Sequence, residues 1–213
     1  MIKKFTMKKF YFMLLAFAGT FAMAQVTFNP GIRAGANFAH LSDLNNSATY
    51  YYDSNGTYVE SNPEFKTIVD AYVGFQANIR FTKVYALQPE INYSRQGSEV
   101  RDNNSNTITT LRTGYVGMQL VNKFYMNNFN LHVGPMIDFL VSNNIPQSNQ
   151  YNGYTDSVTP IDLGIVLGAG YDFTPNFGAE VRLKKGIIPV DFFDGNNTNV
   201  VFQTGVYFTF PIK

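Results

Sequence analysis

Hydrophobic and polar residues alternate with a period of two along eight stretches of this chain. In the clearest stretch, apolar residues at every second position from Val69 to Phe81 alternate with polar residues that include Asp70 and Arg80. Because successive side chains of a β-strand point to opposite faces, this period predicts strands with one apolar and one polar face. The predicted strands cover residues 28–38, 69–81, 85–94, 115–124, 129–139, 161–172, 177–184 and 200–210.

The composition of the polar face distinguishes two kinds of β-barrel. In a soluble sandwich or ligand-binding barrel, the apolar face is the interior and the polar face is an exposed surface rich in Lys and Glu. Here the polar face combines charged residues with glycines and small amides, and the apolar face carries no charge over eight strands. This arrangement suits lipid outside and a narrow polar lumen inside. The pattern therefore predicts an all-β fold, an eight-stranded antiparallel up-and-down transmembrane β-barrel.

Short and long connections alternate between these strands. The short ones cover 82–83, 126–128 and 174–176, and the long ones cover roughly 41–66, 97–108, 142–158 and 186–198. In outer-membrane barrels the short turns face the periplasm and the long loops face the exterior, and an even strand number brings both termini to the periplasm. We therefore expect this protein in the outer membrane of a Gram-negative-type bacterium.

The first 24 residues have the form of a secretory signal peptide. Four lysines precede an apolar run over residues 10–24 that ends in Ala22-Met23-Ala24, which predicts cleavage between Ala24 and Gln25. The alternative, a membrane anchor, is disfavoured because a spanning helix needs about 20 apolar residues. We expect a signal peptide over 1–24 and a single barrel domain over 25–213.

Composition and charge agree with this assignment. Charged residues make up 15% of the chain and aromatic residues 16%, and there is no cysteine, so disulfides and lipid attachment at an N-terminal cysteine are excluded. Cleavage after residue 24 leaves 12 basic and 15 acidic residues, a net charge of −3. This balance gives no indication of nucleic-acid binding.

Aromatic residues of the apolar face recur near the predicted periplasmic end of the strands. Such a girdle marks the interface between membrane and water in outer-membrane barrels. The predicted girdle consists of Phe28, Phe81, Tyr85, Phe124, Phe129, Phe173, Phe177 and Phe210.

Ten charged residues take the inward face of the predicted strands. An eight-stranded barrel is just wide enough for side chains to fill it, and buried charges are costly unless they pair. Since five of these residues are acidic and five basic, we predict a structural ion-pair network that closes the lumen; the alternative is a gated ion path. The predicted network consists of Arg33, Asp70, Arg80, Glu90, Lys123, Asp138, Asp162, Glu180, Arg182 and Lys184.

Few residues point to catalysis or metal binding. His40, Ser42 and Asp43 lie together at the end of the first strand, as in an acyl-transfer site, but three such residues are common at a loop junction. His132 has no second histidine or cysteine to complete a metal site. The acidic loop residues match no EF-hand spacing; they are Asp53, Glu60, Glu64, Asp191 and Asp194. We expect no enzymatic activity, no cofactor and no metal.

Several strand segments carry a family resemblance. The segments are Gly31–Phe38, Leu87–Gly97, Tyr115–Phe124, Gly164–Tyr171 and the strand around Arg182. In these segments the chain resembles the PorT-like outer-membrane β-barrel family, which is common in the Bacteroidetes lineage, and the similarity covers essentially all of residues 25–213. It departs from the family at Gln119, where a proline is usual, and at the chain end, which lacks a terminal aromatic residue. The resemblance implies an eight-stranded barrel in the outer membrane and implies no substrate.

The expected function is that of a non-enzymatic outer-membrane barrel with a side-chain-filled lumen and a role in surface interaction or envelope structure. The long loops carry tyrosines among Asn, Ser, Asp and Gly, a composition that suits adaptable contacts. The alternative is a small transport or protein-secretion component, because one type of PorT-like protein takes part in secretion and gliding. Expected partners are outer-membrane lipid, the barrel-assembly machinery and an unidentified protein at the extracellular loops.

Overall fold

A computed structural model describes residues 26–42, 49–52, 58–61, 63–102, 108–144, 159–189 and 197–211. The predicted signal peptide over 1–24 and its cleavage site between Ala24 and Gln25 lie outside these residues.

Eight strands form a closed antiparallel barrel. They are β1 (Thr27–Ser42), β5 (Ile68–Arg80), β6 (Tyr85–Asp102), β7 (Ile108–Met126), β8 (Phe129–Asn143), β9 (Ile161–Asp172), β10 (Phe177–Gly186) and β11 (Thr198–Thr209). Each strand pairs with the barrel strands before and after it in the sequence, and β11 pairs with β1 to close the ring. The predicted eight-stranded up-and-down barrel is therefore confirmed.

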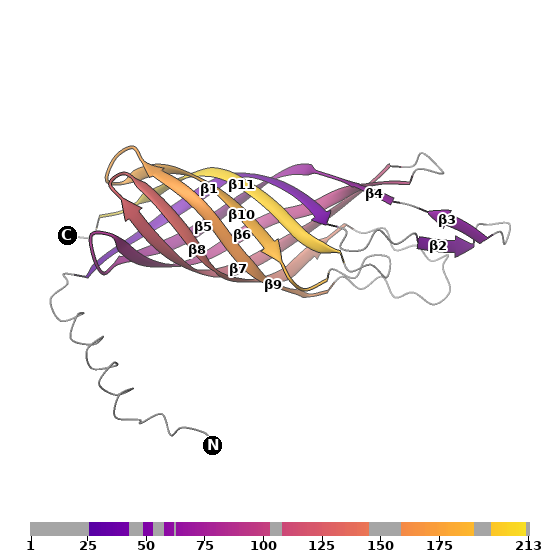
Figure 1. Ribbon diagram of the computed structural model, residues 1–213, viewed down its shortest axis with the longest axis horizontal. Helices are drawn as coiled ribbons and strands as arrows, with labels where there is room; N and C mark the ends of the chain where they lie inside the picture. Colours follow the sequence, from indigo (N-terminus) through magenta and orange to yellow (C-terminus); the bar gives the residue numbers. More distant parts are fainter. Residues whose placement is uncertain are drawn as a thin grey trace, which may run out of the picture.

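The three short turns lie together at one end of the barrel. Residues 81–84 connect β5 to β6, residues 127–128 connect β7 to β8, and residues 173–176 connect β9 to β10. The strand β1 begins and β11 ends at this same end (Figure 1). In the tightest turn Asn127 has a φ of 57°, the left-handed conformation that two-residue hairpin turns require. We call this the short-turn end and the opposite one the long-loop end.

Some strands continue well past the barrel at the long-loop end. The predicted loop over 97–108 is wrong in extent, because β6 runs to Asp102, β7 begins at Ile108, and their ladder continues to the pair Arg101 and Ile108. The predicted loop over 41–66 also contains the paired strands β2 (Thr49–Tyr52) and β3 (Tyr58–Ser61), and β4 (Pro63–Lys66), which pairs with β6. These extensions escaped prediction because they lack the regular apolar face of the barrel strands.

Proline residues interrupt two ladders of the barrel. The β5–β6 pairing breaks off after Gln76 and Glu90 and resumes at Ile79 and Leu87, beside Pro89. The β7–β8 pairing is interrupted in the same way opposite Pro135. A proline has no backbone N–H to donate to a ladder, so a local loss of pairing is the expected consequence.

The two faces of the barrel wall differ sharply in exposure. On the outer face Phe75 is 72% exposed and Val69 is 60% exposed, whereas Arg33 and Arg182 on the inner face are each 1% exposed. The strand β8 alternates between exposed and buried residues from Phe129 onward. The charged side chains are therefore inside and the apolar ones outside, the reverse of a water-soluble barrel.

Across the described residues, no α-helix has the length and hydrophobicity needed to cross a membrane.

Candidate functional site: the filled lumen

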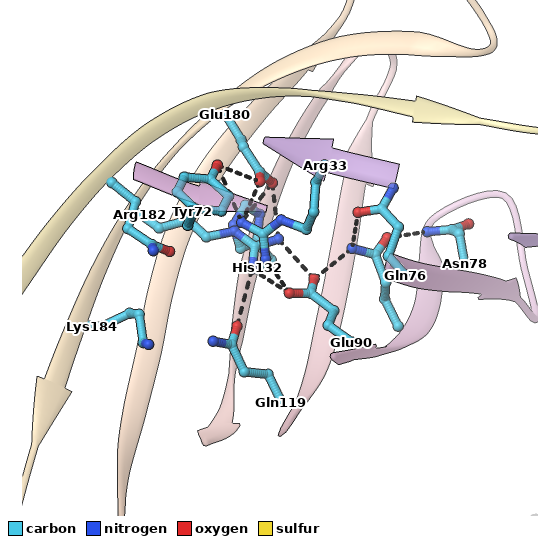
Figure 2. A network of polar contacts seen from close by, with 12 residues as sticks. Arg33, Tyr72, Gln76, Asn78, Glu90, Gln119, His132, Glu180, Arg182 and Lys184 are labelled. Atoms are coloured by element: carbon cyan, nitrogen blue, oxygen red, sulfur yellow. Dashed lines mark hydrogen bonds and ion pairs between the residues drawn. The ribbon is translucent and has the colours of Figure 1, made fainter. Parts of the chain in front are cut away.

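Two arginines and two glutamates meet in the middle of the lumen. Arg33 comes from β1, Glu90 from β6, and both Glu180 and Arg182 from β10 (Figure 2). Each arginine is ion-paired with both glutamates, and all four side chains are at most 1% exposed. We call these four residues the ionic quartet.

Hydrogen-bond geometry in the ionic quartet is that of strong charge-assisted pairs. The guanidinium of Arg182 donates to both carboxylate oxygens of Glu90, over 2.7 and 2.8 Å, and to Oε2 of Glu180 over 2.9 Å. Arg33 donates to Glu180 over 2.5 Å and also to Glu90. Because two positive and two negative charges balance, the cluster is neutral and joins opposite walls of the barrel.

Neutral side chains complete the coordination of the ionic quartet. Arg182 also donates to the amide oxygen of Gln119 over 3.3 Å, and Arg33 lies 4.9 Å from the ring centre of Tyr72. Towards the short-turn end, Gln88 donates to Glu90 over 2.7 Å and to Gln76 over 3.1 Å. These side chains come from β5, β6 and β7, so the network ties together five of the eight barrel strands.

Glycines on the inner face make room for this cluster. A Cβ atom on Gly168 of β9 would lie 2.8 Å from Cγ of Arg182, and one on Gly35 of β1 would lie 2.8 Å from the ring of Tyr72. Since ordinary van der Waals contact begins at about 3.4 Å, neither position tolerates a larger residue without rearrangement. The inward glycines therefore belong to the packing of the lumen.

A second ion pair lies in the long-loop half of the lumen. Lys184 of β10 contacts Asp138 of β8 over 2.6 Å, and both side chains are at most 2% exposed. Gln96 also donates to Asp138, over 3.2 Å. Asp162 lies directly opposite Asp138 in the β8–β9 ladder, but its hydrogen bond comes from Asn199 over 3.0 Å. The predicted network is thus divided into separate groups.

Arg80 and Lys123 occupy the short-turn half of the lumen and pair with aromatic rings. The guanidinium of Arg80 lies 3.8 Å from the ring centre of Tyr125, and the ammonium of Lys123 lies 4.6 Å from that of Tyr207. Within the described part of the chain, no carboxylate is ion-paired with either residue. Both residues are therefore separate from the ionic quartet.

The ion-pair partners of Asp70 differ from the prediction, which placed this residue in the lumen network. Its carboxylate lies 3.5 Å from Arg95 and 3.9 Å from Arg112, whose side chains are 46% and 45% exposed. The β4–β6 ladder ends at Lys66 and Glu99, and the β5–β6 ladder begins at Tyr72 and Ser94, so Asp70 lies in the unpaired interval between the two ladders. Its ion pairs are therefore with arginines outside the ionic quartet.

The residues of the predicted aromatic girdle all lie at the short-turn end. Six of them are exposed large side chains, among them Phe28 at 50% and Phe173 at 57%. Rings are close across the turns: the ring centres of Phe173 and Phe177 are 5.8 Å apart, and those of Phe81 and Tyr85 are 6.0 Å apart. The six exposed members are Phe28, Phe124, Phe129, Phe173, Phe177 and Phe210.

The residues considered for catalysis do not form a site among the described residues. The Ser42 hydroxyl is 2.9 Å from that of Thr198 and accepts a hydrogen bond from Lys185 over 2.6 Å, with no hydrogen bond to His40 described. Asp43 lies outside the described residues.

The residues considered for metal binding are equally dispersed. His132 is 1% exposed and its Nδ1 contacts Asn130 over 3.1 Å. In the described ranges no three His, Cys, Asp or Glu side chains gather closely enough to hold a metal ion. Of the acidic loop residues, Asp53, Asp191 and Asp194 lie outside the described residues, and the side chains of Glu60 and Glu64 are not described.

The prediction from charge alone missed the amides and hydroxyls that fill the lumen. Asn37 is 0% exposed, donates to Ser94 over 2.9 Å and accepts from Gln203 over 2.7 Å. Like Gln88 and Tyr72, these residues take the inward face of their strands. The same alternation that located the charges could therefore have located them, had all polar residues of that face been included.

Comparisons with known proteins agree with this geometry. The family model described as outer membrane protein beta-barrel domain matches residues 23–191, most of the chain. A comparison with curated proteins finds no match.

Two solved structures illustrate the similarity of fold. Neisserial surface protein A is 17% identical, with 85% of this chain and 97% of that chain covered and a TM-score of 0.52. The outer membrane protein OprG from Pseudomonas aeruginosa is 12% identical, with 89% and 99% covered and a TM-score of 0.51. At this level of identity the similarity concerns the fold.

Proposed function

This chain belongs to the outer membrane protein beta-barrel family and is an integral barrel of the bacterial outer membrane, and from this premise we propose that it is a non-conducting, non-enzymatic scaffold for surface interaction. The observation that carries the proposal is the ionic quartet. A steady ion current needs a continuous path through the barrel. Here, ion-paired side chains that are at most 1% exposed connect β1, β6 and β10 across the lumen.

The outer surface gives the scaffold a broad contact with lipid. Exposed apolar side chains occupy every barrel strand, for example Val73 at 55%, Ile91 at 55% and Leu167 at 56%. Exposed apolar surface of this extent on a monomer marks contact with lipid or another protein. In the outer membrane this belt contacts lipid, and the aromatic girdle lies at its periplasmic edge.

The long β6–β7 ribbon supports a role at the cell surface. β6 has 18 residues and β7 has 19, whereas a membrane-spanning strand needs about 9–11. The surplus residues form a paired ribbon that β4 joins at the long-loop end (Figure 1). In the usual orientation of such barrels this end is extracellular. A hydrogen-bonded ribbon presents its own side chains in a fixed geometry, which lowers the entropy cost of binding a partner.

A role in protein secretion is the second candidate, favoured by the resemblance of Leu87–Gly97 and Tyr115–Phe124 to the PorT-like family. For such a role the partner surface is the periplasmic, short-turn end, where Val84 is 62% exposed.

Planar-bilayer recording tests the closed lumen. Purified wild-type barrel is expected to give no steady single-channel current, while the variant with both Arg33→Ala and Glu90→Ala, which stays electrically balanced, is expected to conduct. The variant Arg95→Ala changes a partly exposed arginine outside the lumen and serves as the control. A steady current from the wild type contradicts the proposal.

Site-specific photo-crosslinking in cells separates the two roles. A photoreactive residue at Ile108 of the ribbon is expected to yield adducts with protein, and one at Val73 in the apolar belt is expected to yield adducts with lipid. Protein adducts from Val84 with none from Ile108 favour the secretion role and reject the surface role. Both positions have large exposed side chains, at 50% for Ile108 and 62% for Val84, so access is comparable.

A further inference from the structure

A cavity of about 350 Å³ lies inside the barrel at the short-turn end. Its inner wall includes Gln76 and Gln88, which connect by hydrogen bonds to Glu90 of the ionic quartet. Its outer wall is formed by residues of two short turns, among them Asn127 and Thr174. The cavity therefore ends at the ionic quartet on one side and at the turns on the other.

Positive charge dominates the walls of this cavity. Arg80, Lys123 and Asp172 are its charged lining residues, which gives a formal charge of +1. The carboxylate of Asp172 already accepts a hydrogen bond from the hydroxyl of Tyr207. No ion pair is described between Asp172 and either cation. The single negative group is thus hydrogen-bonded to another lining residue of the cavity, Tyr207, and is not ion-paired with the cations.

Lys123 is the least expected feature of the cavity. The residue is 1% exposed, and its ammonium has aromatic neighbours at 4.6 Å from the Tyr207 ring centre and 5.9 Å from that of Tyr125. Burial of a charge without an ion-pair partner is costly, and cation–π contacts offset only part of that cost. A buried lysine is usually compensated by an ion pair, as Lys184 is in the same lumen, where it contacts Asp138 over 2.6 Å.

Two lining side chains have a nitrogen donor without an acceptor. Nε2 of the neutral Gln76 and Nε of the cationic Arg80 are buried and have no hydrogen-bond partner. Both residues line the cavity together with Lys123. Three nitrogen donors and a surplus positive charge around one small cavity are complementary to a ligand with several oxygen acceptors and negative charge.

We propose that this cavity binds a small soluble oxyanion, a phosphate or a compact carboxylate, with Lys123 and Arg80 as its cationic ligands. A volume of about 350 Å³ is at the lower end of the range of small-molecule sites. Its walls come from inward-facing residues and turns, which the barrel wall separates from the surrounding lipid. The occupant is therefore a solute that enters from the short-turn end, which faces the periplasm in this class of barrel.

Isothermal titration calorimetry tests the proposal with inorganic phosphate as the probe. The full barrel is titrated in zwitterionic detergent micelles, with sodium chloride of equal ionic strength as the reference, and a heat-dependent gel shift verifies folding of each variant. Wild-type protein is expected to show saturable binding of one phosphate. Lys123→Met is expected to raise the Kd about tenfold or more, as for the loss of one hydrogen bond to a charged group. Arg80→Gln is expected to weaken binding in the same direction.

Arg95→Gln serves as the matched control, because Arg95 is a partly exposed arginine whose carboxylate contact is with Asp70. Its affinity for phosphate is expected to equal that of the wild type. Absence of saturable binding in the wild type, or unchanged affinity in Lys123→Met, overturns the proposal. If Lys123→Met fails to fold, unchanged affinity in Arg80→Gln overturns it.

A second experiment, in lipid nanodiscs, distinguishes a soluble oxyanion from a lipid headgroup. In nanodiscs of phosphatidylcholine the wild type is expected to retain phosphate binding, and added phosphatidylglycerol is expected to leave the Kd unchanged. If instead phosphate does not bind and only phosphatidylglycerol raises the thermal stability in a Lys123-dependent manner, the ligand is a lipid headgroup and the soluble-oxyanion proposal is rejected.

Discussion

The middle and the short-turn end of the lumen both contain buried cationic side chains, but these side chains have different partners in the two regions. In the middle, Arg33 and Arg182 each bind two carboxylates, and the side chains are at most 1% exposed. At the short-turn end, Arg80 and Lys123 lie against tyrosine rings beside a cavity. Neither of them is ion-paired with a carboxylate of the described residues. A balanced cluster can close a lumen, whereas unbalanced cations keep capacity for a ligand. The comparison therefore separates residues that hold the barrel together from residues that are free to bind.

The largest effect is expected from Glu90→Ala in the ionic quartet. The change leaves Arg33 and Arg182 buried with one carboxylate between them, and removal of one partner from a buried pair costs about 3–5 kcal/mol. We expect a loss at the upper end of this range, measured as the free energy of unfolding in urea for barrels reconstituted in vesicles. A loss below about 1 kcal/mol would show that the cluster does not stabilise the barrel.

The two buried lysines provide the most direct contrast. Lys184→Met leaves Asp138 buried without its cation and is expected to cost about 3 kcal/mol. Lys123→Met removes an ammonium that has no ion-paired carboxylate among the described residues, so its stability is expected to change by less than about 1 kcal/mol or to increase. Both are measured by urea unfolding in phosphate-free buffer. Equal losses in the two variants would remove the distinction between the two regions.

A steric change tests whether the inward glycines serve the packing of the quartet. In Gly168→Val the new side chain collides with His132 and Arg182, since even a Cβ atom would lie 2.8 Å from Cγ of Arg182 and closer still to Nε2 of His132. Overpacking of this kind costs about 1–3 kcal/mol, measured by the same unfolding experiment. Ala169→Val adds methyl groups to the neighbouring residue, which takes the outward face of β9, and is the control. Equal stability of Gly168→Val and wild type contradicts the packing role.

The smallest effect is expected where Asp70 contacts Arg95 and Arg112. Asp70→Asn removes ion pairs of 3.5 and 3.9 Å between a carboxylate whose side chain is 9% exposed and arginines that are nearly half exposed and therefore solvated. Exposed pairs contribute about 0–1 kcal/mol and are screened by salt, so we expect a small loss that disappears in 1 M sodium chloride. A loss comparable to that of Glu90→Ala would place Asp70 in the lumen network after all.

Sequence periodicity predicted the barrel well because the residues of each strand alternate between two environments, the polar lumen and the lipid, and this alternation can be seen in each strand by itself. The alternation from Val69 to Phe81 identifies β5 and assigns Arg80 to the inner face without knowledge of any neighbour. The extensions of β6 and β7 were missed for the same reason. Beyond the apolar belt both faces are polar, so residues 97–102 have the pattern of a loop although they form a ladder with β7.

Side-chain partners could not be predicted in this way. Arg33 and Glu90 are 57 residues apart, and Arg33 and Glu180 are 147 apart, so their contact depends on how the sheet closes. Inward orientation was equally evident for Lys123 and Arg182, yet only Arg182 has carboxylates within reach. Asp70 was assigned to the lumen network by its position in the alternation, but it lies in the unpaired interval between the β4–β6 and β5–β6 ladders and its carboxylate contacts Arg95 instead.

The sequence by itself determined the strands, their order, their inner and outer faces and the class of the barrel, because these follow from a local period of two residues. Only the tertiary structure decided which charges neutralise one another and where a cavity remains. Strand stagger and barrel closure set the height of each side chain in the lumen, and at distances of a few ångströms that height determines whether a charge meets an opposite charge, an aromatic ring or open space.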